Sequence, residues 1–207
     1  MIQTSSPFIS GVVFSGGEPA MQKEALIVLA EKSKKMGLAV GIQTSGLFPE
    51  TLAALLEKNL ADKIAIDYKS RWEAYSLAKG PGNASPKYEK NVKRSIQICA
   101  DAYRAKTLME CEVVVTVFYE NEKYIKTISE SIGDIPLVLQ QGEHKIPMLP
   151  DGTENLTAYI AGKQTKKEQY TPMTLAEIEK IAENLKRDVR IRTREVGEIV
   201  CARRFIL

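Results

Sequence analysis

The chain has 207 residues, 44% of them hydrophobic, and a net charge of +3 at pH 7. This is enough chain for one sizeable core and predicts one domain. Lysine and arginine are spread among acidic residues, so the charge does not indicate a nucleic-acid-binding protein. No apolar run approaches the ~20 residues of a membrane span, and Met1–Pro7 lacks the pattern of a secretory signal. We therefore expect a cytoplasmic protein.

The three cysteines, Cys99, Cys111 and Cys201, lie far apart in the sequence. Their spacing fits no zinc or iron–sulfur motif. Cys99 falls on the apolar face of a predicted helix and Cys111 within a predicted strand. The pattern favours small buried hydrophobic residues over metal ligands.

The first predicted element is an apolar strand, Gly11–Phe14, of the kind that is buried on both faces. Ser15-Gly16-Gly17 ends this strand, and Glu18-Pro19 precedes a helical pattern. Two glycines bring bare backbone close to whatever lies above the strand end, since neither has a Cβ atom. Parallel α/β folds bind their ligands at such strand ends. A tight βα turn with a Glu-Pro helix start would give the same pattern.

Helices and strands alternate after the first strand, and polar residues follow the strands. Apolar residues recur at helical spacing in some segments and form β-branched runs in others. This alternation of βα units predicts a parallel sheet. The expected elements are helices over 24–35, from Pro49, over 92–103, over 120–132 and from the capping box at 174–177, and strands over 39–42, 63–66, 112–118, 137–141, 189–193 and 198–202.

Five βα-type strands are too few for a closed eight-stranded barrel, which needs about 250 residues. We expect an incomplete parallel (β/α) barrel in a single domain over 1–207. Its barrel units occupy 1–142, a polar excursion follows over 143–170, and a last helix and a pair of strands complete 171–207.

The stretch Val12–Pro19 resembles the Gly-Gly-Glu motif of radical S-adenosylmethionine (radical SAM) enzymes. It most resembles the branch that activates glycyl-radical enzymes, such as anaerobic ribonucleotide reductase and pyruvate formate-lyase. The resemblance implies a TIM-like partial barrel and an oxidoreductase with S-adenosylmethionine and a [4Fe-4S] cluster as cofactors. It also implies a glycyl-radical enzyme as protein partner, with anaerobic ribonucleotide reductase as the first choice, and neither nucleic acid nor membrane.

In that family, three closely spaced cysteines hold the cluster and precede the Gly-Gly-Glu motif. Only ten residues precede Gly11, and none of them is cysteine. We interpret this as a missing first βα unit. The chain is then either a truncated form of an enzyme that has the cysteines, which the polar strand ends favour, or a shortened relative without a cluster. In both cases we expect the chain as printed to bind neither cofactor well and to be inactive.

The resemblance assigns cofactor-binding roles to residues at the strand ends. The first strand end would receive the amino group of the cofactor's methionine moiety, and hydroxyl and amide groups at the second would bond its ribose hydroxyls or the partner's backbone. An ordinary helix N-cap is the alternative for the second strand end. The residues concerned are Ser15, Gly16, Gly17 and Glu18 at the first strand end, and Gln43, Thr44 and Ser45 at the second.

Asp67-Tyr68-Lys69 resembles the Asp-x-Lys strand end of the activating enzymes. Lys69 would pair with the cofactor's carboxylate, and Asp67 would hold Lys69 or a cation. A structural ion pair between the two is the alternative. The stretch 138–141 resembles the last barrel strand of archaeal-type reductase activators, which places Gln140 near the adenine. The resemblance yields no catalytic residue and no metal ligand in this chain.

Two other functions and one mode of association stay open. A non-catalytic module would bind the partner or a nucleoside without cleaving the cofactor. A Schiff-base aldolase-type barrel would use Lys69 as nucleophile, although Asp67 two residues away favours the charged form of this lysine. The apolar edge of Gly11–Phe14 would also allow a homodimer, because an uncovered strand edge invites another strand.

Overall fold

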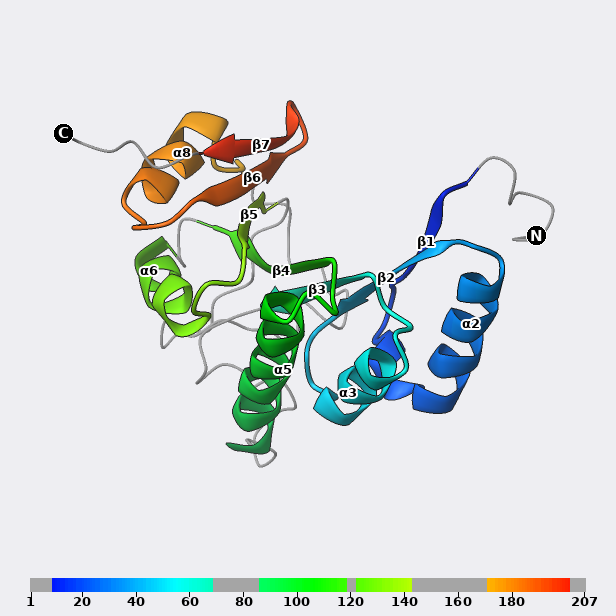
Figure 1. Cartoon of the computed structure of the whole chain (residues 1–207). Helices are drawn as coiled ribbons and strands as arrows, with labels where there is room; N and C mark the ends of the chain where they lie inside the picture. Colours follow the sequence, from blue (N-terminus) through cyan, green and yellow to red (C-terminus); the bar gives the residue numbers. More distant parts are fainter. Residues whose placement is uncertain (1–8, 69–85, 119–121, 143–170, 202–207) are drawn as a thin grey trace, which may run out of the picture. The chain divides into compact units, whose positions relative to one another are not determined.

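The computed structural model describes residues 9–68, 86–118, 122–142 and 171–201, and the statements below refer to these residues. Seven strands form one sheet in the order β1-β2-β3-β4-β5-β6-β7. β1 pairs with β2, β2 with β3 and β5 with β6 in parallel, whereas β6 and β7 are antiparallel. Helices alternate with the strands along the chain, as Figure 1 shows by colour. The predicted class, a mostly parallel α/β sheet, is therefore confirmed.

The bounds of the expected elements agree with the structure to within two residues, except that α5 begins at Pro86, well before the expected range 92–103. In chain order they are β1 (Gly11–Phe14), η2 (Pro19–Met21), α2 (Lys23–Lys35), β2 (Ala39–Thr44), α3 (Pro49–Glu57), β3 (Lys63–Tyr68), α5 (Pro86–Arg104), β4 (Glu110–Val117), α6 (Glu122–Ser131), β5 (Leu137–Gln141), α8 (Leu175–Glu183), β6 (Val189–Thr193) and β7 (Gly197–Cys201).

The chain divides into two compact units. The first comprises residues 1–68 and 90–113, and the second comprises 69–89 and 114–207. Each unit contains strands with the helices that cover them. The single domain expected from the sequence stays a prediction.

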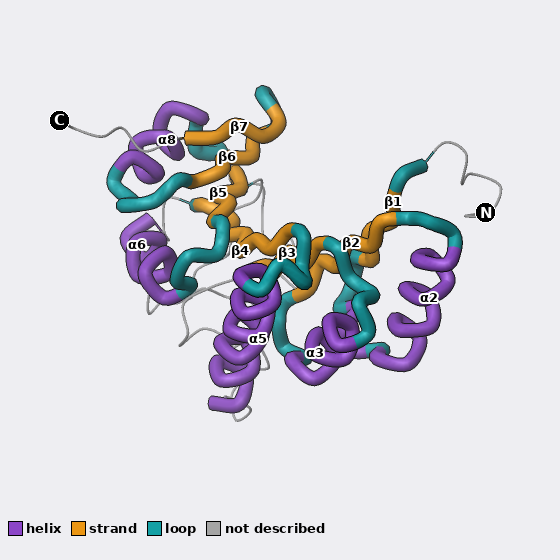
Figure 2. The backbone as a smooth tube through the Cα atoms, in the orientation of Figure 1, coloured by secondary structure: helices purple, strands orange, loops and turns teal. Residues whose placement is uncertain are grey.

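In the first unit, helices cover one face of the sheet. α2 and α3 lie on the same side of β1 and β2 (Figure 2), and α2 contacts both strands. Side chains alternate between the two faces of each strand, so Val40 and Ile42 of β2 are buried while Ala39 and Gln43 are exposed. The buried apolar residues of this face and its helices are Leu26, Ala30, Val40, Ile42, Leu52, Leu55, Ile64, Ile66, Val92 and Ile96.

The sequence predicted that β1 is buried on both faces, and this is wrong. Val13 is 68% exposed, because β1 stands at the end of the strand order and pairs with only one strand among the described residues. The helices cover the face opposite to Val13. Leu29 of α2 is also exposed. The homodimer through this strand stays a prediction.

β2 and β3 are each two residues longer than predicted. Thr44 pairs with Ile66 in the sheet. The polar residues that the sequence predicted after the two strands therefore belong to the strands themselves. Asp67 is consequently part of β3, whereas Lys69 lies outside the described residues, as do the polar stretches 71–85 and 145–170.

The second unit contains the parallel pair β5–β6 and the hairpin β6–β7. The predicted capping box begins α8, since Thr174 Oγ1 accepts from the Glu177 backbone and the Glu177 side chain accepts from the Thr174 backbone. The core of this unit consists of Val115, Val117, Ile125, Ile128, Ile135, Leu137, Leu139, Ile178, Ile181, Val189 and Ile191. Within the described ranges, no helix combines the length and the apolar character needed to cross a membrane.

Arg187 joins three backbone carbonyl groups of the second unit. Its Nη1 donates to Ser129 O at 2.9 Å and to Gly133 O at 2.7 Å, and its Nη2 donates to Ile135 O. These carbonyls belong to the end of α6 and the segment that leads into β5, where backbone acceptors lack helical partners.

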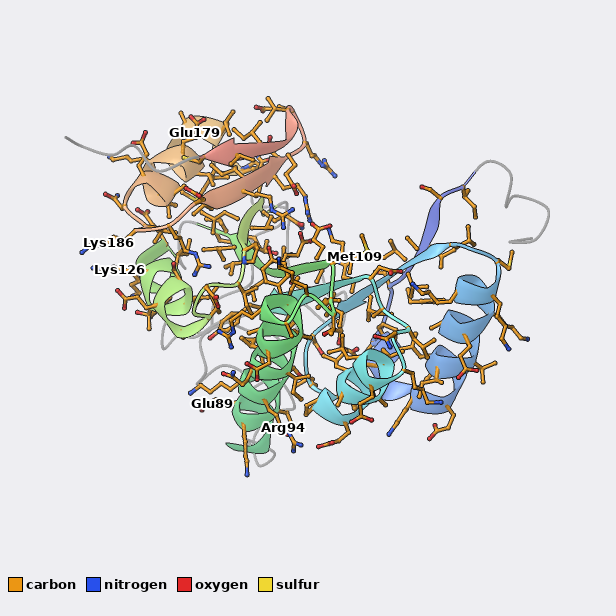
Figure 3. All side chains as sticks on the ribbon, in the orientation of Figure 1. Glu89, Arg94, Met109, Lys126, Glu179 and Lys186 are labelled. Atoms are coloured by element: carbon orange, nitrogen blue, oxygen red, sulfur yellow. The ribbon has the colours of Figure 1, made fainter. Side chains whose placement is uncertain are left out.

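We expect Arg187→Met to lower the free energy of unfolding by about 2–3 kcal/mol, because hydrogen bonds from a charged donor contribute about 1.5–3 kcal/mol. Urea unfolding followed by circular dichroism measures the loss. Lys186 is exposed and extends outward (Figure 3), so Lys186→Met is the matched control and should change stability by less than ~0.5 kcal/mol. Equal losses in the two variants would contradict this role of Arg187.

Candidate functional site

The turn after β1 exposes glycine backbone to open space. Gly16 has φ +85° and Gly17 has φ +54°, which is the left-handed region that favours glycine. A Cβ atom at either position would meet no heavy atom within 4 Å. Conformation rather than crowding therefore requires glycine here, and no described residue fills the place of a Cβ atom beside this backbone.

Glu18 begins a short helical turn directly after the glycines. Its side chain caps η2 by accepting from the Ala20 backbone N–H at 3.0 Å, and Pro19 is the first residue of η2. The Glu-Pro helix start that the sequence offered as an alternative is thus present. It does not exclude a further role, since the same carboxylate has other partners.

Those partners come from the end of β2. Thr44 Oγ1 donates to Glu18 Oε1 at 2.6 Å, the Ser45 backbone N–H donates to Oε2 at 2.8 Å, and Ser45 Oγ also donates to Oε2. The neighbouring strand ends are therefore joined through one carboxylate. Ser15 adds a second link between them, because its hydroxyl donates to Gln43 Oε1 at 2.9 Å.

Hydrogen bonds behind the strand ends fix this arrangement from inside the first unit. The Gly46 N–H donates to Thr44 Oγ1 at 3.1 Å, and Ser95 Oγ of α5 donates to Gly46 O at 2.7 Å. Thr51 Oγ1 of α3 donates to Ala20 O at 2.8 Å. All three bonds are buried, so the strand-end turns are held by the helices that cover the sheet.

The structure brings together most of the predicted site residues of the first unit. Gln43 pairs with Ala65 in the sheet, so the half-buried Asp67 lies two residues further along the same face of β3. Ser15–Glu18 and Gln43–Ser45 meet directly through the contacts above. Lys69 lies outside the described residues, and its predicted role is untested.

Gln140 belongs to the second unit, at the end of β5. Arg192 Nη1 donates to Gln140 Oε1 at 3.4 Å, and Arg192 Nη2 also forms an ion pair with Glu198 at 2.6 Å. Gln140 is thus engaged by β6 of its own unit. Its predicted place near the adenine stays a prediction.

Sequence reasoning missed Ser95, which is fully buried and donates to the turn after β2. A signal was present. Ser95 stands between Val92 and Ile96 on the apolar face of α5, and a serine at such a position needs a hydrogen-bond partner inside the protein.

The cysteines do not form a metal site within the described part of the chain, where no group of three His, Cys, Asp or Glu side chains can hold a metal ion. Cys99 and Cys111 are fully buried. A hydrogen bond with Cys111, together with burial, raises the pKa of Cys99 well above its ordinary value, which favours the neutral thiol over the thiolate that ligates metals. The described cysteines therefore do not fit an iron–sulfur cluster.

Charged residues at the opposite ends of the strands have a structural role. Lys63 Nζ lies 2.9 Å from Glu110 and 3.2 Å from Glu112, whose side chain is 2% exposed. Burial lowers the pKa of Lys63, but its hydrogen bonds and charge interactions with these carboxylates outweigh burial and leave the pKa raised. The lysine stays protonated and neutralises a buried carboxylate.

Comparisons with known proteins identify one curated relative and two solved structures of interest. No protein-family model matches the chain. A protein of Methanocaldococcus jannaschii, provisionally named as a glycyl-radical enzyme activating enzyme, is 30% identical over 139 residues. The match covers 67% of this chain and 57% of the relative, so the chain spans little more than half of the relative's length.

A domain of pyruvate-formate lyase-activating enzyme from Bacteroides vulgatus matches 63% of this chain and 78% of its own with 21% identity and a TM-score of 0.46. The structure of TYW1 with a lysine-pyruvate adduct bound matches 91% of this chain and 54% of its own with 14% identity and a TM-score of 0.57. The second match shows a shared fold. The sequence similarity to the M. jannaschii protein supports the same family as the resemblance of the Gly-Gly-Glu turn, the radical SAM activating enzymes.

The left-handed conformation at Gly17 gives a direct test of the turn. In this region, a residue other than glycine, asparagine or aspartate is destabilised by about 1–2 kcal/mol. No steric clash of an added Cβ atom increases that cost. We expect Gly17→Ala to lower the free energy of unfolding by about 1 kcal/mol and Gly17→Asn, the matched control, by clearly less. Urea unfolding of the two variants decides, and a greater loss for asparagine would contradict the turn geometry.

Proposed function

We propose that this chain supplies S-adenosylmethionine-binding strand ends of a radical SAM activating enzyme, which generates a glycyl radical on a partner enzyme. One observation carries the proposal: the ends of β1 and β2 form a single hydrogen-bonded group beside open space. This is the edge of a parallel sheet at which α/β proteins bind ligands. Similarity to the M. jannaschii protein favours an activating enzyme among the proteins with such an edge.

The backbone of Gly16 and Gly17 is the proposed site for the ammonium group of the methionine moiety. Carbonyl oxygens accept hydrogen bonds from an ammonium, and both residues are exposed and carry no side chain of their own. The negative charge of Glu18, directly beside them in the chain, favours a cation at this place. The glycine backbone and the nearby carboxylate thus suit a positively charged, hydrogen-bond-donating group.

The hydroxyl and amide groups of Ser15 and Gln43 are the proposed site for the ribose hydroxyls. Both side chains are exposed, and the Ser15 hydroxyl already orients the Gln43 amide by donating to its oxygen. The Gln43 amide nitrogen then remains as a donor for a ligand oxygen. Asp67, on the same sheet face, and Lys69 and Gln140 complete the proposed set from the family resemblance.

In an intact enzyme, one electron from a reduced cluster would cleave the cofactor to methionine and a 5′-deoxyadenosyl radical, which would take a hydrogen atom from a glycine of the partner. The protein contributes binding, orientation and the exclusion of water. The described residues do not fit the [4Fe-4S] cluster, so they assign no step to it. Anaerobic ribonucleotide reductase is the partner that we propose, and the cytoplasm is the compartment.

We expect the chain as printed to bind S-adenosylmethionine weakly, with a dissociation constant of about 1 mM. Each hydrogen bond contributes only about 0.5–1.5 kcal/mol, whereas association costs at least ~4 kcal/mol. Titration of the ¹⁵N-labelled chain followed by NMR should shift the amide signals of Gly16, Gly17 and Ser45. The control ligand 5′-methylthioadenosine lacks the amino acid moiety and should leave the glycine signals unchanged.

Two results of this titration would contradict the proposal. Absence of any shift at the strand ends at several times ~1 mM ligand would remove the site. A dissociation constant near ~1 μM, equivalent to about 8 kcal/mol, would mean that the chain holds the nucleoside without further ligands. That result would favour a non-catalytic binding module.

We also expect that anaerobic treatment of the chain as printed with iron and sulfide assembles no cluster. The reason is that Cys99 and Cys111 are fully buried and Cys201 belongs to the other unit. Iron analysis after desalting, together with the visible absorption of iron–sulfur clusters, is the measurement. A stoichiometric content of about four irons per chain would show that the chain assembles a site from its cysteines after all.

A further inference from the structure

We infer that Glu18 is a positioning residue: its carboxylate holds the ends of β1 and β2 together and leaves contact with the ligand to other groups. The inference rests on the proposed function in so far as it names the role of Glu18 in cofactor binding. Its structural basis does not depend on any ligand. We refer to the Glu18 carboxylate and its donors on Ala20, Thr44 and Ser45 as the Glu18 clamp.

The Glu18 clamp uses the full hydrogen-bonding capacity of the carboxylate. An ionised carboxylate offers about four acceptor positions on its two oxygens. Oε1 accepts from Ala20 N and Thr44 Oγ1, and Oε2 accepts from Ser45 N and Ser45 Oγ. A ligand ammonium that contacted Glu18 would have to displace one of these donors.

Two of these donors are backbone N–H groups. The N–H groups of Ala20 and Ser45 are backbone donors that the carboxylate satisfies directly, and unpaired backbone donors are costly when shielded from water. Thr44 is buried, and its hydroxyl accepts from Gly46 N at the same time. Displacement would therefore disturb a connected network rather than free a single bond.

The Glu18 clamp also explains how the glycine turn is kept in place. The turn Ser15–Gly17 has no side chain that packs into the core, and its residues are exposed. It is fixed at one end by the pairing of β1 with β2 and at the other by Glu18. The position of the glycine backbone is thus set by the bonds that Glu18 makes with the end of β2.

The test separates the negative charge of Glu18 from its hydrogen bonds. Thr44→Val removes one donor of the Glu18 clamp but keeps the carboxylate charged, and Thr44→Ser is the matched control that restores the hydroxyl. Ser45→Ala removes a second donor and leaves the buried Gly46–Thr44 bond intact. It therefore provides a second test if Thr44→Val does not fold. Glu18→Gln removes the charge and turns an amide NH₂ toward either Ala20 N–H or Ser45 N–H.

Amide exchange without ligand tests the Glu18 clamp itself. If it holds the strand ends, exchange in Glu18→Gln should rise about five- to tenfold at whichever of Ala20 and Ser45 faces the amide NH₂, as expected for the loss of a hydrogen bond. Thr44→Val and Ser45→Ala should raise the exchange at Ser45 in the same direction, and Thr44→Ser should not. Unchanged exchange at both amides in Glu18→Gln would overturn the inference.

Titration with S-adenosylmethionine tests the role in binding. A positioning role predicts that Thr44→Val and Glu18→Gln weaken binding by similar factors, within about threefold of each other, and that Thr44→Ser retains wild-type affinity. Direct contact predicts that Glu18→Gln abolishes binding while Thr44→Val leaves it unchanged, and this result would overturn the inference. If the wild-type chain shows no binding, the proposed function fails, and the exchange experiment alone decides whether Glu18 holds the strand ends.

Discussion

The first unit depends on one constraint, namely that neighbouring parallel strands end side by side and leave polar backbone groups that need partners. β1 and β2 both end in turns rather than running directly into helices, so helical hydrogen bonds cannot supply those partners. The Glu18 carboxylate supplies them for Ala20 and Ser45 and takes up the Thr44 hydroxyl as well. The exposed glycine backbone has no core contacts of its own, so the bonds of the following residue fix its place at the strand end.

The two ends of the strands use charge differently. At the amino ends, Lys63 forms an ion pair with the buried carboxylate of Glu112. This buried charge would be costly without its partner. At the carboxyl ends, the charge of Glu18 is met by neutral backbone and hydroxyl donors. Among the described residues, the negative charge there is met by hydrogen bonds and not by the side chain of a cationic residue. This difference agrees with a structural role for the amino ends and a ligand-binding role for the carboxyl ends.

Sequence patterns predicted the alternation of elements and the turn at Ser15–Glu18, because both depend on local spacing. They did not predict the exposure of Val13, since the burial of a strand depends on which strands and helices lie beside it. The lengths of β2 and β3 were underestimated because Thr44 and Asp67 are polar, although pairing in the sheet places both within strands. Ser95 was missed because its acceptor, the carbonyl of Gly46, lies on a distant part of the chain.

The resemblance to the Gly-Gly-Glu motif points to residues that meet at the strand ends, but it does not distinguish between their physical roles. The glycines satisfy a conformational requirement and present bare backbone, while the glutamate satisfies donors from a different strand. A motif that is continuous in sequence thus combines exposed glycine backbone with a glutamate whose carboxylate oxygens already accept hydrogen bonds from other residues. Because two of the bonds between Glu18 and the end of β2 come from side chains that the motif does not include, the strand end depends on the identity of Thr44 and Ser45 as well as on the glutamate.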